Sequence, residues 1–525
     1  MSFADQAERT LGALASTPGW RLLQEARPDC DDGTVAEILG QAAGFSGRVL
    51  APLNGIGDRQ GARLVDGRVK TPDGFIDAFR DYAKAGWLAV DLPERHGGQG
   101  LPLTVHAACA PLFERGCVAL MMAAGSSRAA AHLLAETAGE DLAGEWVPKL
   151  AAGEWAATIC ISEPDAGSDV GRIRTRAEQS DDSWQISGQK TWISFGDHDL
   201  TDRIGHCLLA RTGREAGTKG LSLFLVPSTI DGLNNRVTVD RIEDKMGLHG
   251  SPTCALLFER SHGWLIGSEG KGLPQLFRMI ELMRLQTACQ GLGLASASAD
   301  IAERYAQERR QGGDAERPAV PISDHPDVRR QLRVMRTRTE VLRLAVLELA
   351  SAMDLVRLEP SPDRRREADD FCAWMLPLIK NFGAGAGFDV TNSAIQVLGG
   401  AGYTRDWPLE QYLRDARVMT IYEGTTGMQA LDFLTRRLWR DEGRGCRAFL
   451  KRARGELAAL REHHPQEVRD ALAVLDEFQA SAEVMMSLRE RPDEAFYRAN
   501  DYFDAGWAAL SAWLTLRLPE RISAA

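Results

Sequence analysis

Long hydrophobic runs are missing from this sequence. No apolar stretch approaches the roughly 18–20 residues that a membrane-spanning helix needs. The N-terminal segment, MSFADQAERT, carries acidic side chains early and has no hydrophobic core. We therefore expect no signal peptide, no transmembrane segment and a cytoplasmic location.

Paired cysteines are missing as well. The nine cysteines are odd in number, and no two of them form a Cys-x-x-Cys motif. This pattern is typical of reduced thiols and excludes a disulfide framework or a zinc finger. The ten histidines lack the spacing of metal ligands, so we expect no metal site.

Basic residues are in deficit. Lys and Arg number 62 against 73 Asp and Glu, which gives a net charge of −11. Such a chain is a poor candidate for wrapping nucleic acid. Its 44% hydrophobic and 26% charged residues are ordinary for a globular protein. A length of 525 residues exceeds what one hydrophobic core organises, so we expect several packed units.

Composition and hydrophobic periodicity divide the chain into four segments. Residues 1–154 show helical patterns broken by turns, and residues 155–272 carry short β-rich runs between Gly, Asp, Asn and Pro. Residues 273–444 contain long proline-free stretches with apolar residues at helical spacing, and residues 445–525 are helical again. We predict an α+β multidomain fold: an N-terminal helical domain, a central antiparallel β-barrel domain, a C-terminal four-helix bundle and a helical C-terminal extension.

Four segments carry side chains suited to chemistry. The first is the turn Ser162-Glu-Pro-Asp-Ala-Gly-Ser168-Asp, which follows Ile159. Its proline and glycine favour a loop whose N–H groups and hydroxyls point outward and suit the oxygens of a cofactor or substrate. The alternative is a plain loop that leads into the β domain.

The second segment is the predicted strand Gly188–Ser194. Side chains alternate along a strand, so Trp192 and Ser194 share one face. Together they could cover a planar ring and hydrogen-bond its edge. A tryptophan in the core of the barrel is the alternative.

The third segment, Ile395–Tyr403, places Gly399 and Gly400 after Gln396. The glycines end the preceding helix and permit close backbone approach. Because the segment follows a helix and no strand, it is not the fingerprint of a Rossmann unit. An NAD-binding doubly wound domain is therefore excluded.

The fourth segment, Met419–Gly427, contains Glu423 after an apolar pair. A desolvated carboxyl has a pKa raised from about 4.3 towards neutrality, as a general base for a carbon-bound proton requires. The alternative is an acid at a helix start that interacts with the helix dipole.

The order of these segments resembles that of the acyl-CoA dehydrogenase family between residues 159 and 427. The resemblance includes Lys245–Thr253, Gly270–Gly272 and Glu308–Gly312, and Pro93–Gly100 fits the family's N-terminal domain. Two inserts, Asn54–Arg59 and Phe195–Thr201, and the C-terminal extension are similar to those of a bacterial branch of the family. That branch includes the methylmercaptopropionyl-CoA dehydrogenases and the large fatty-acyl-CoA dehydrogenases.

The resemblance implies an FAD site shared between the subunits of a homodimer or homotetramer. Ser162 corresponds to a contact with the pyrimidine edge of the flavin, Trp192 to the aromatic wall and Ser194 to a hydroxyl near N5. At position 311 this chain has Gln where the family often has Thr. At position 427 it has Gly where the family often has Gln, so any contact of that side chain with FAD is lost. The remaining expected FAD contacts are Ile159, Ser168, Arg309, Gln311, Gln396, Gly399, Gly400, Thr425 and Gly427.

The resemblance also implies an acyl-CoA substrate and makes Glu423 the catalytic base. Two branches of the family take the base from the residue before Arg284; here that residue is Met283, which cannot accept a proton. Glu281 stands where the family commonly has Asp. The expected substrate contacts are Ser168, Glu281, Arg284, Tyr422 and Gly424.

The implied reaction is the α,β-dehydrogenation of an acyl-CoA to a trans-2-enoyl-CoA, as in fatty-acid β-oxidation. Glu423 removes the α-proton while flavin N5 takes the β-hydride. The backbone N–H of Glu423 and a ribityl hydroxyl polarise the thioester carbonyl. Electrons then pass to an electron-transferring flavoprotein.

Two alternatives stay open on the same fold. One is an acyl-CoA oxidase or flavin monooxygenase. The other is a DNA-associated member of the fold, in which the arginine-rich segment 436–454 would contact phosphates. We interpret that segment instead as a solvated or subunit-facing helix, or as one that attracts CoA phosphates, and expect no nucleic-acid partner.

Overall fold

The computed structural model describes residues 2–181 and 183–518, which form two compact units. The first unit comprises residues 1–44, 103–115 and 284–525, and the second comprises residues 45–102 and 116–283. Two long helices, α6 (Leu103–Thr137) and α8 (Gly272–Glu308), continue from one unit into the other. Non-helical backbone at Cys117 interrupts α6 close to the boundary. The predicted division into four domains remains a prediction.

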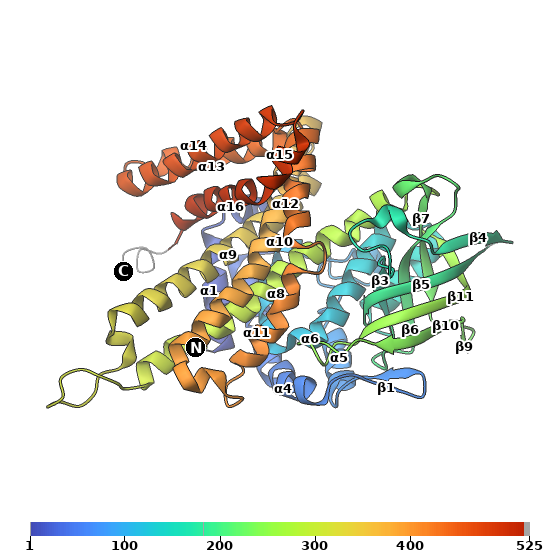
Figure 1. The fold of residues 1–525 in the computed structure, drawn as a ribbon, viewed down its shortest axis with the longest axis horizontal. Helices are drawn as coiled ribbons and strands as arrows, with labels where there is room; N and C mark the ends of the chain where they lie inside the picture. Colours follow the sequence, from blue (N-terminus) through green and yellow to red (C-terminus); the bar gives the residue numbers. More distant parts are fainter. Residues whose placement is uncertain (1, 182, 519–525) are drawn as a thin grey trace. The chain divides into compact units, whose positions relative to one another are not determined.

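The first unit is a helical assembly, in which α9 and α10 pack along each other (Figure 1). Its apolar core includes Ala295 of α8, Met335 of α9 and Val390 of α10. The absence of proline correctly predicted α8 and α9 as long helices. Besides parts of α6 and α8, the helices of this unit are α1 (Phe3–Ala15), α2 (Pro18–Ala26), α3 (Asp32–Phe45), α9 (Pro326–Leu358), α10 (Pro362–Leu398), α11 (Leu409–Arg417), α12 (Thr426–Leu434), α13 (Arg444–Leu460), α14 (Pro465–Ser487), α15 (Pro492–Tyr497) and α16 (Ala499–Thr515).

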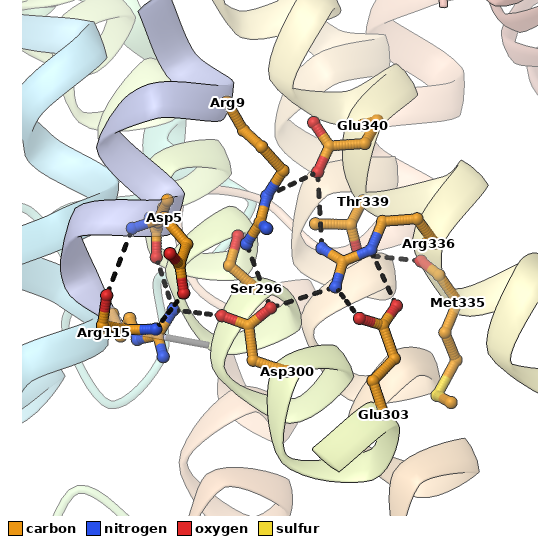
Figure 2. A network of polar contacts seen from close by, with 12 residues as sticks. Asp5, Arg9, Arg115, Ser296, Asp300, Glu303, Met335, Arg336, Thr339 and Glu340 are labelled. Carbon is orange, nitrogen blue, oxygen red and sulfur yellow. Dashed lines mark hydrogen bonds and ion pairs between the residues drawn. The ribbon is translucent and has the colours of Figure 1, made fainter. Parts of the chain in front are cut away.

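A buried charge network joins α1, α6, α8 and α9 within the first unit (Figure 2). Asp300, which is 1% exposed, accepts hydrogen bonds from Arg9 at 3.0 Å, Arg115 at 2.6 Å and Arg336 at 3.0 Å. Glu340 lies 3.4 Å from the Arg9 guanidinium. Because each buried charge meets opposite charges at hydrogen-bond distance, the cost of desolvation is offset.

The C-terminal extension packs on α9, α10 and α12. Trp374 of α10 stacks on Phe449 of α13 with 4.2 Å between ring centroids. Phe433 of α12 lies 5.0 Å from Tyr502 of α16. In Figure 1 the extension forms the red helices α13, α14 and α16. The predicted helical extension is confirmed, and its aromatic side chains supply its core.

The arginine-rich segment is largely neutralised by acids of the same unit. Arg444 pairs with Asp370 at 2.7 Å, and Lys451 pairs with Glu367 at 2.6 Å. Further ion pairs join Arg436 and Arg437 to Asp432, Arg452 to Glu348, and Arg454 to Asp476. These contacts leave few cations for the phosphates of a nucleic acid.

The second unit contains a closed β-barrel. Strands β5, β4, β6, β7 and β11 pair in that order, and β11 pairs again with β5. The pairs are antiparallel except for β4 with β6 and the added strand β3 with β6. Ile186, Leu208 and Phe224 lie in the core of the barrel. The predicted barrel is confirmed, although the parallel pairs of β6 with β3 and β4 make its sheet mixed and not purely antiparallel.

The helices and strands of the second unit include the strands of this barrel. Besides parts of α6 and α8, they are α4 (Ala51–Gln60), β1 (Arg63–Val65), β2 (Arg68–Lys70), α5 (Phe75–Lys84), α7 (Glu140–Ala151), β3 (Trp155–Cys160), β4 (Arg176–Ser180), β5 (Ser183–Ser194), β6 (Arg203–Arg211), β7 (Leu221–Pro227), β8 (Thr229–Ile230), β9 (Leu233–Asn234), β10 (Val237–Ile242) and β11 (Thr253–Leu265).

Among the described residues, one helix, α6, is long and apolar enough to cross a membrane. Its most apolar 18-residue window has a mean hydropathy of 1.3, and 89% of that window is buried within the protein. Glu114, Arg115 and Arg128 interrupt its apolar residues, which is why no long run stands out in the sequence. Burial of this extent is typical of a core helix.

Candidate active site

The loop between α11 and α12 holds Glu423 in an uncommon backbone conformation. The φ angles are +54° at Glu423 and +93° at Gly424. A left-handed backbone costs a non-glycine residue about 1–3 kcal/mol and persists only where neighbouring groups fix it. Such strain concentrates at functional sites, so the loop is the first candidate for chemistry.

Two fully buried side chains hold the carbonyl groups of this loop. Lys380 of α10 donates from Nζ to the carbonyl oxygens of Tyr422 at 2.6 Å and Gly424 at 2.8 Å. Gln429 of α12 donates from Nε2 to the carbonyl oxygen of Glu423 at 2.8 Å. These hydrogen bonds fix three successive carbonyl groups.

The Glu423 carboxyl is partly buried, and its surroundings raise its pKa. Desolvation raises the pKa, while the positive charges of Arg284 and Lys380 oppose the shift. This direction is the one that the apolar neighbours of Glu423 predicted from the sequence. A carboxyl with a raised pKa can take a proton at neutral pH.

Arg284 lies in the same unit and is engaged by an acid. Its Nη1 donates to Asp432 of α12 at 2.9 Å, and Arg284 is 8% exposed. Asp432 also accepts a hydrogen bond from Arg436 at 3.1 Å. The sequence assigned Arg284 to the substrate, and the structure shows in addition that it is tied to α12, which carries the base loop at its N-terminus.

A second group of polar side chains lies beside the loop. The hydroxyl of Tyr422 donates to Gln290, and Gln286, one helical turn earlier on α8, donates to Glu114 of α6. Glu114 is fully buried, and desolvation raises its pKa well above the usual range. Tyr422 was an expected substrate contact, but Gln290, Gln286 and Glu114 were not predicted, because they are ordinary polar residues within helices.

The flavin-directed motifs of the second unit come together at the ends of β3 and β5. The N–H of Thr191 donates to the carbonyl oxygen of Ser162 at 2.9 Å, and the Thr158 hydroxyl donates to the carbonyl oxygen of Ser194 at 2.7 Å. Trp192 lies in a β-bulge with φ +62°, and its side chain is 64% exposed. The predicted alternative of a core tryptophan is wrong, since the bulge turns this ring out of the barrel.

A buried ion pair fixes the first motif to the second. Lys190 donates to Glu163 at 2.9 Å and to the carbonyl oxygen of Ile161 at 2.9 Å. Glu163 also accepts from the N–H groups of Arg174 at 2.7 Å and Thr175 at 3.0 Å. Burial alone would raise the pKa of Glu163, but Lys190 and these donors lower it. Sequence reasoning did not single out either partner.

Comparison with known proteins decides the family. The descriptions "Acyl-CoA dehydrogenase, N-terminal domain", "middle domain" and "C-terminal domain" match residues 62–154, 158–261 and 270–438. The chain belongs to the acyl-CoA dehydrogenase family. The resemblance inferred from the motifs is thereby confirmed, and with it the expectation of an FAD-dependent oxidoreductase.

Two relatives and one solved structure show how far the similarity extends. The chain is 36% identical to 3-methylmercaptopropionyl-CoA dehydrogenase of Ruegeria pomeroyi, over 80% of this chain and 73% of the relative. It is 35% identical to broad-specificity linear acyl-CoA dehydrogenase FadE5 of Mycobacterium tuberculosis, over 79% and 71%. Caenorhabditis elegans ACDH-11 in complex with C11-CoA has a TM-score of 0.80 at 21% identity, over 94% and 85%, which shows the shared fold.

The remaining family positions in the first unit lie on exposed segments. Arg309 and Gln311 are exposed, with 3.4 Å between Arg309 Nη2 and Gln311 Oε1. Gln396, Gly399 and Gly400 are also exposed, and Gly399 ends α10 with φ +61°. Thr425 caps α12 by accepting from the N–H of Met428 at 3.4 Å. A Cβ atom at position 427 would meet no described atom within 4 Å.

The other predicted positions belong to the second unit. Ile159 lies in β3, paired with Cys207 of β6. Ser168 is exposed in its turn. Glu281 lies 3.7 Å from Arg278. Each unit therefore carries a subset of the predicted residues: the second holds Ile159, Ser162, Ser168, Trp192, Ser194 and Glu281, and the first holds the others.

The residues present fit the flavin of this family. An indole ring that is 64% exposed leaves a large apolar surface in water, and a planar ring system can cover it. The Ser162 and Ser194 segments flank Trp192 with polar groups suited to the edge of such a ring. Among the described residues, no cluster of three metal-ligating side chains occurs, and the nine cysteines are buried free thiols.

Proposed function

We propose that this chain removes two hydrogens from the α- and β-carbons of an acyl-CoA thioester, with Glu423 as the base for the α-proton. The observation that carries the proposal is the Glu423 loop: a strained backbone, fixed by buried side chains, presents a carboxyl whose pKa is raised. A merely structural acid at a helix start would need neither feature.

The carboxylate can abstract the α-proton only if the thioester carbonyl is polarised. The N–H of Glu423 donates to no acceptor among the described residues, so it can donate to the carbonyl oxygen of a bound thioester. A donor placed at a developing oxyanion is worth about 3–4 kcal/mol. The base and the donor that assists it would thus come from one residue.

FAD would be held by Ser162, Trp192 and Ser194, with Ile159 and Ser168 nearby in sequence. The positions Arg309, Gln311, Gln396, Gly399, Gly400, Thr425 and Gly427 would complete its contacts across the subunits of a homodimer or homotetramer. When bound, FAD supplies the acceptor for a hydride from the β-carbon. Electron-transferring flavoprotein would receive the electrons.

The substrate would be a CoA thioester recognised by Ser168, Glu281, Arg284, Tyr422 and Gly424. The relatives are named for acyl-CoA substrates that differ in their acyl groups. The product would be a 2-enoyl-CoA, because the α-proton and the β-hydride leave neighbouring carbons, and the family resemblance implies the trans isomer.

Anaerobic titration with a panel of acyl-CoA thioesters tests the proposal. We expect the flavin absorbance to bleach with at least one of them, and the Glu423→Gln variant to retain FAD without bleaching. Turnover by Glu423→Gln at the wild-type rate would refute the assignment of the base. Reoxidation by oxygen that is faster than by electron-transferring flavoprotein would indicate an oxidase instead.

A further inference from the structure

We propose that Lys380 is the positioning residue of the catalytic loop: its ammonium group fixes the direction of the Glu423 N–H and supplies a positive charge that faces the Glu423 carboxyl. This inference rests on the proposed function of Glu423 as the base. The sequence assigned no role to Lys380, which lies in the middle of α10 between Ile379 and Asn381.

The first step is the burial of Lys380. The residue is 0% exposed, and its Nζ donates to two backbone carbonyl groups, those of Tyr422 and Gly424. A buried ammonium is costly unless its donors are satisfied by hydrogen bonds. The loop therefore satisfies Lys380, and Lys380 in turn holds the loop on both sides of the base.

The second step follows from the geometry of a trans peptide. The carbonyl of Tyr422 and the N–H of Glu423 belong to one planar unit and point in opposite directions. A carbonyl held by Lys380 therefore aims the Glu423 N–H away from α10. In the same way, the contact of Gln429 with the Glu423 carbonyl directs the N–H of Gly424. The polarising donor is thus positioned by a side chain that touches no substrate.

The third step concerns the charges that face Glu423. Arg284 from α8 and Lys380 from α10 both act to lower its pKa against desolvation. Arg284 also forms an ion pair with Asp432 of α12, at 2.9 Å from Nη1 to the carboxylate. Tyr422, beside Glu423, faces the carboxyl groups of Glu114 and Glu423. Lys380 is therefore the cation whose hydrogen bonds go to the loop itself.

The titration of Lys380 matches this role. Desolvation and Arg284 lower its pKa to about 7, and the negative charge of Glu423 opposes that shift. A positive charge that is present at low pH and lost near neutrality stabilises the carboxylate mainly on the acidic side.

Two substitutions separate orientation from charge. Lys380→Gln keeps N–H donors for the carbonyl groups but removes the charge, and Lys380→Met removes both. For Lys380→Met we expect kcat to fall about 100-fold with KM changed less than about 3-fold, because misplaced groups lose rate more than binding. For Lys380→Gln we expect a loss of about 10-fold or less at the optimal pH.

Both variants should move the acidic limb of kcat/KM to higher pH by about 1 unit or more, because loss of a nearby cation raises the pKa of a carboxylate. Infrared difference spectra against the same protein carrying Glu423→Gln report the carboxyl protonation directly and should show the same shift. Arg517→Met, which removes a buried cation far along the chain from the loop, should leave the acidic limb in place.

The outcomes are distinct. If wild type bleaches with acyl-CoA and Glu423→Gln does not, but Lys380→Gln and Lys380→Met keep the wild-type acidic limb, the role of Lys380 is overturned while the proposed function stands. If Lys380→Met fails to fold, an unchanged acidic limb in Lys380→Gln is by itself enough to overturn the role of Lys380. If Glu423→Gln turns over normally, the proposed function fails first.

Discussion

The ammonium group of Lys190 lies 2.9 Å from a carboxylate oxygen of Glu163, and Lys190 is completely buried. The pair joins the turn that carries Ser162 to the strand that carries Trp192 and Ser194. Two motifs that lie apart in the sequence are thus held in register by one ion pair inside the second unit. We expect the pair to act on the proposed flavin site through the segments that it fixes.

Replacing Lys190 by Met should destabilise the second unit and loosen its hold on FAD. The Glu163 carboxylate would stay buried with its two backbone donors but without its cation, which we expect to cost about 3 kcal/mol. Chemical unfolding and the fraction of FAD retained after gel filtration measure the two effects.

The double variant Lys190→Met/Glu163→Gln is the matched control. It removes both charges, so part of the lost stability should return, because the unpaired buried charge is gone. A double variant that is less stable than Lys190→Met would contradict the assignment of this pair.

Replacing Trp192 by Ala should weaken FAD binding with little loss of stability in the protein without FAD. The ring is 64% exposed, so its truncation removes few packing contacts, but it removes the apolar face proposed for the flavin. Equilibrium titration of the apoprotein with FAD, followed by flavin fluorescence, gives the affinity. Leu233→Ala is the control, because Leu233 is 73% exposed in the same unit and is assigned no contact with FAD. Equal affinities of the two variants would remove Trp192 from the site.

The long elements were predictable because they depend on local signals. The lack of proline after Pro274 and Pro326 marks α8 and α9, whose lengths are set by backbone propensity and an apolar stripe. Strands such as β6 and β7 were marked by β-branched and apolar runs between turns. Strand β3 ends at Cys160, directly before the turn motif that begins at Ser162.

The candidate base was also predictable, since Glu423 lies in a short motif with apolar neighbours. The buried side chains that hold the loop of this base, and those that hold the turn of Ser162, were not predictable. Lys380 and the carbonyl of Tyr422 are 42 residues apart in the sequence, and Lys190 is 27 residues from Glu163. Nothing local distinguishes a buried lysine with two carbonyl partners from one at the surface, so such contacts depend on the folded chain.

Replacing Arg517 by Met should weaken the attachment of the end of the C-terminal extension to α9. Arg517 pairs with the fully buried Glu348 of α9 at 2.6 Å and with Glu456 of α13 at 2.6 Å. Arg452 stays as a partner for Glu348, so we expect a loss of about 2–3 kcal/mol in unfolding free energy. Arg454→Met removes a more exposed pair with Asp476 and should cost less than about 1 kcal/mol. Equal costs for the two variants would show that the Glu348 pair does not anchor the extension.

The buried imidazole of His198 should make the second unit sensitive to acid. Its pKa is lowered to about 4, chiefly by desolvation, with further lowering by Arg68 and His206 and opposition from Asp197 and Asp199. In the unfolded chain the imidazole binds a proton below about pH 6.5, whereas the folded protein resists protonation until about pH 4. The unfolded state therefore binds more protons in this window, and stability falls as pH falls from about 6.5 to 4.

A shift of this size corresponds to about 3 kcal/mol over the window. His198→Asn keeps an acceptor for the N–H of Leu200, which His198 accepts at 3.2 Å, and cannot be protonated. Urea midpoints measured between pH 7 and pH 4 should therefore fall more steeply for wild type than for His198→Asn. His463→Asn, at an exposed position, controls for the loss of an imidazole. Parallel curves for wild type and His198→Asn would show that His198 does not carry the acid sensitivity.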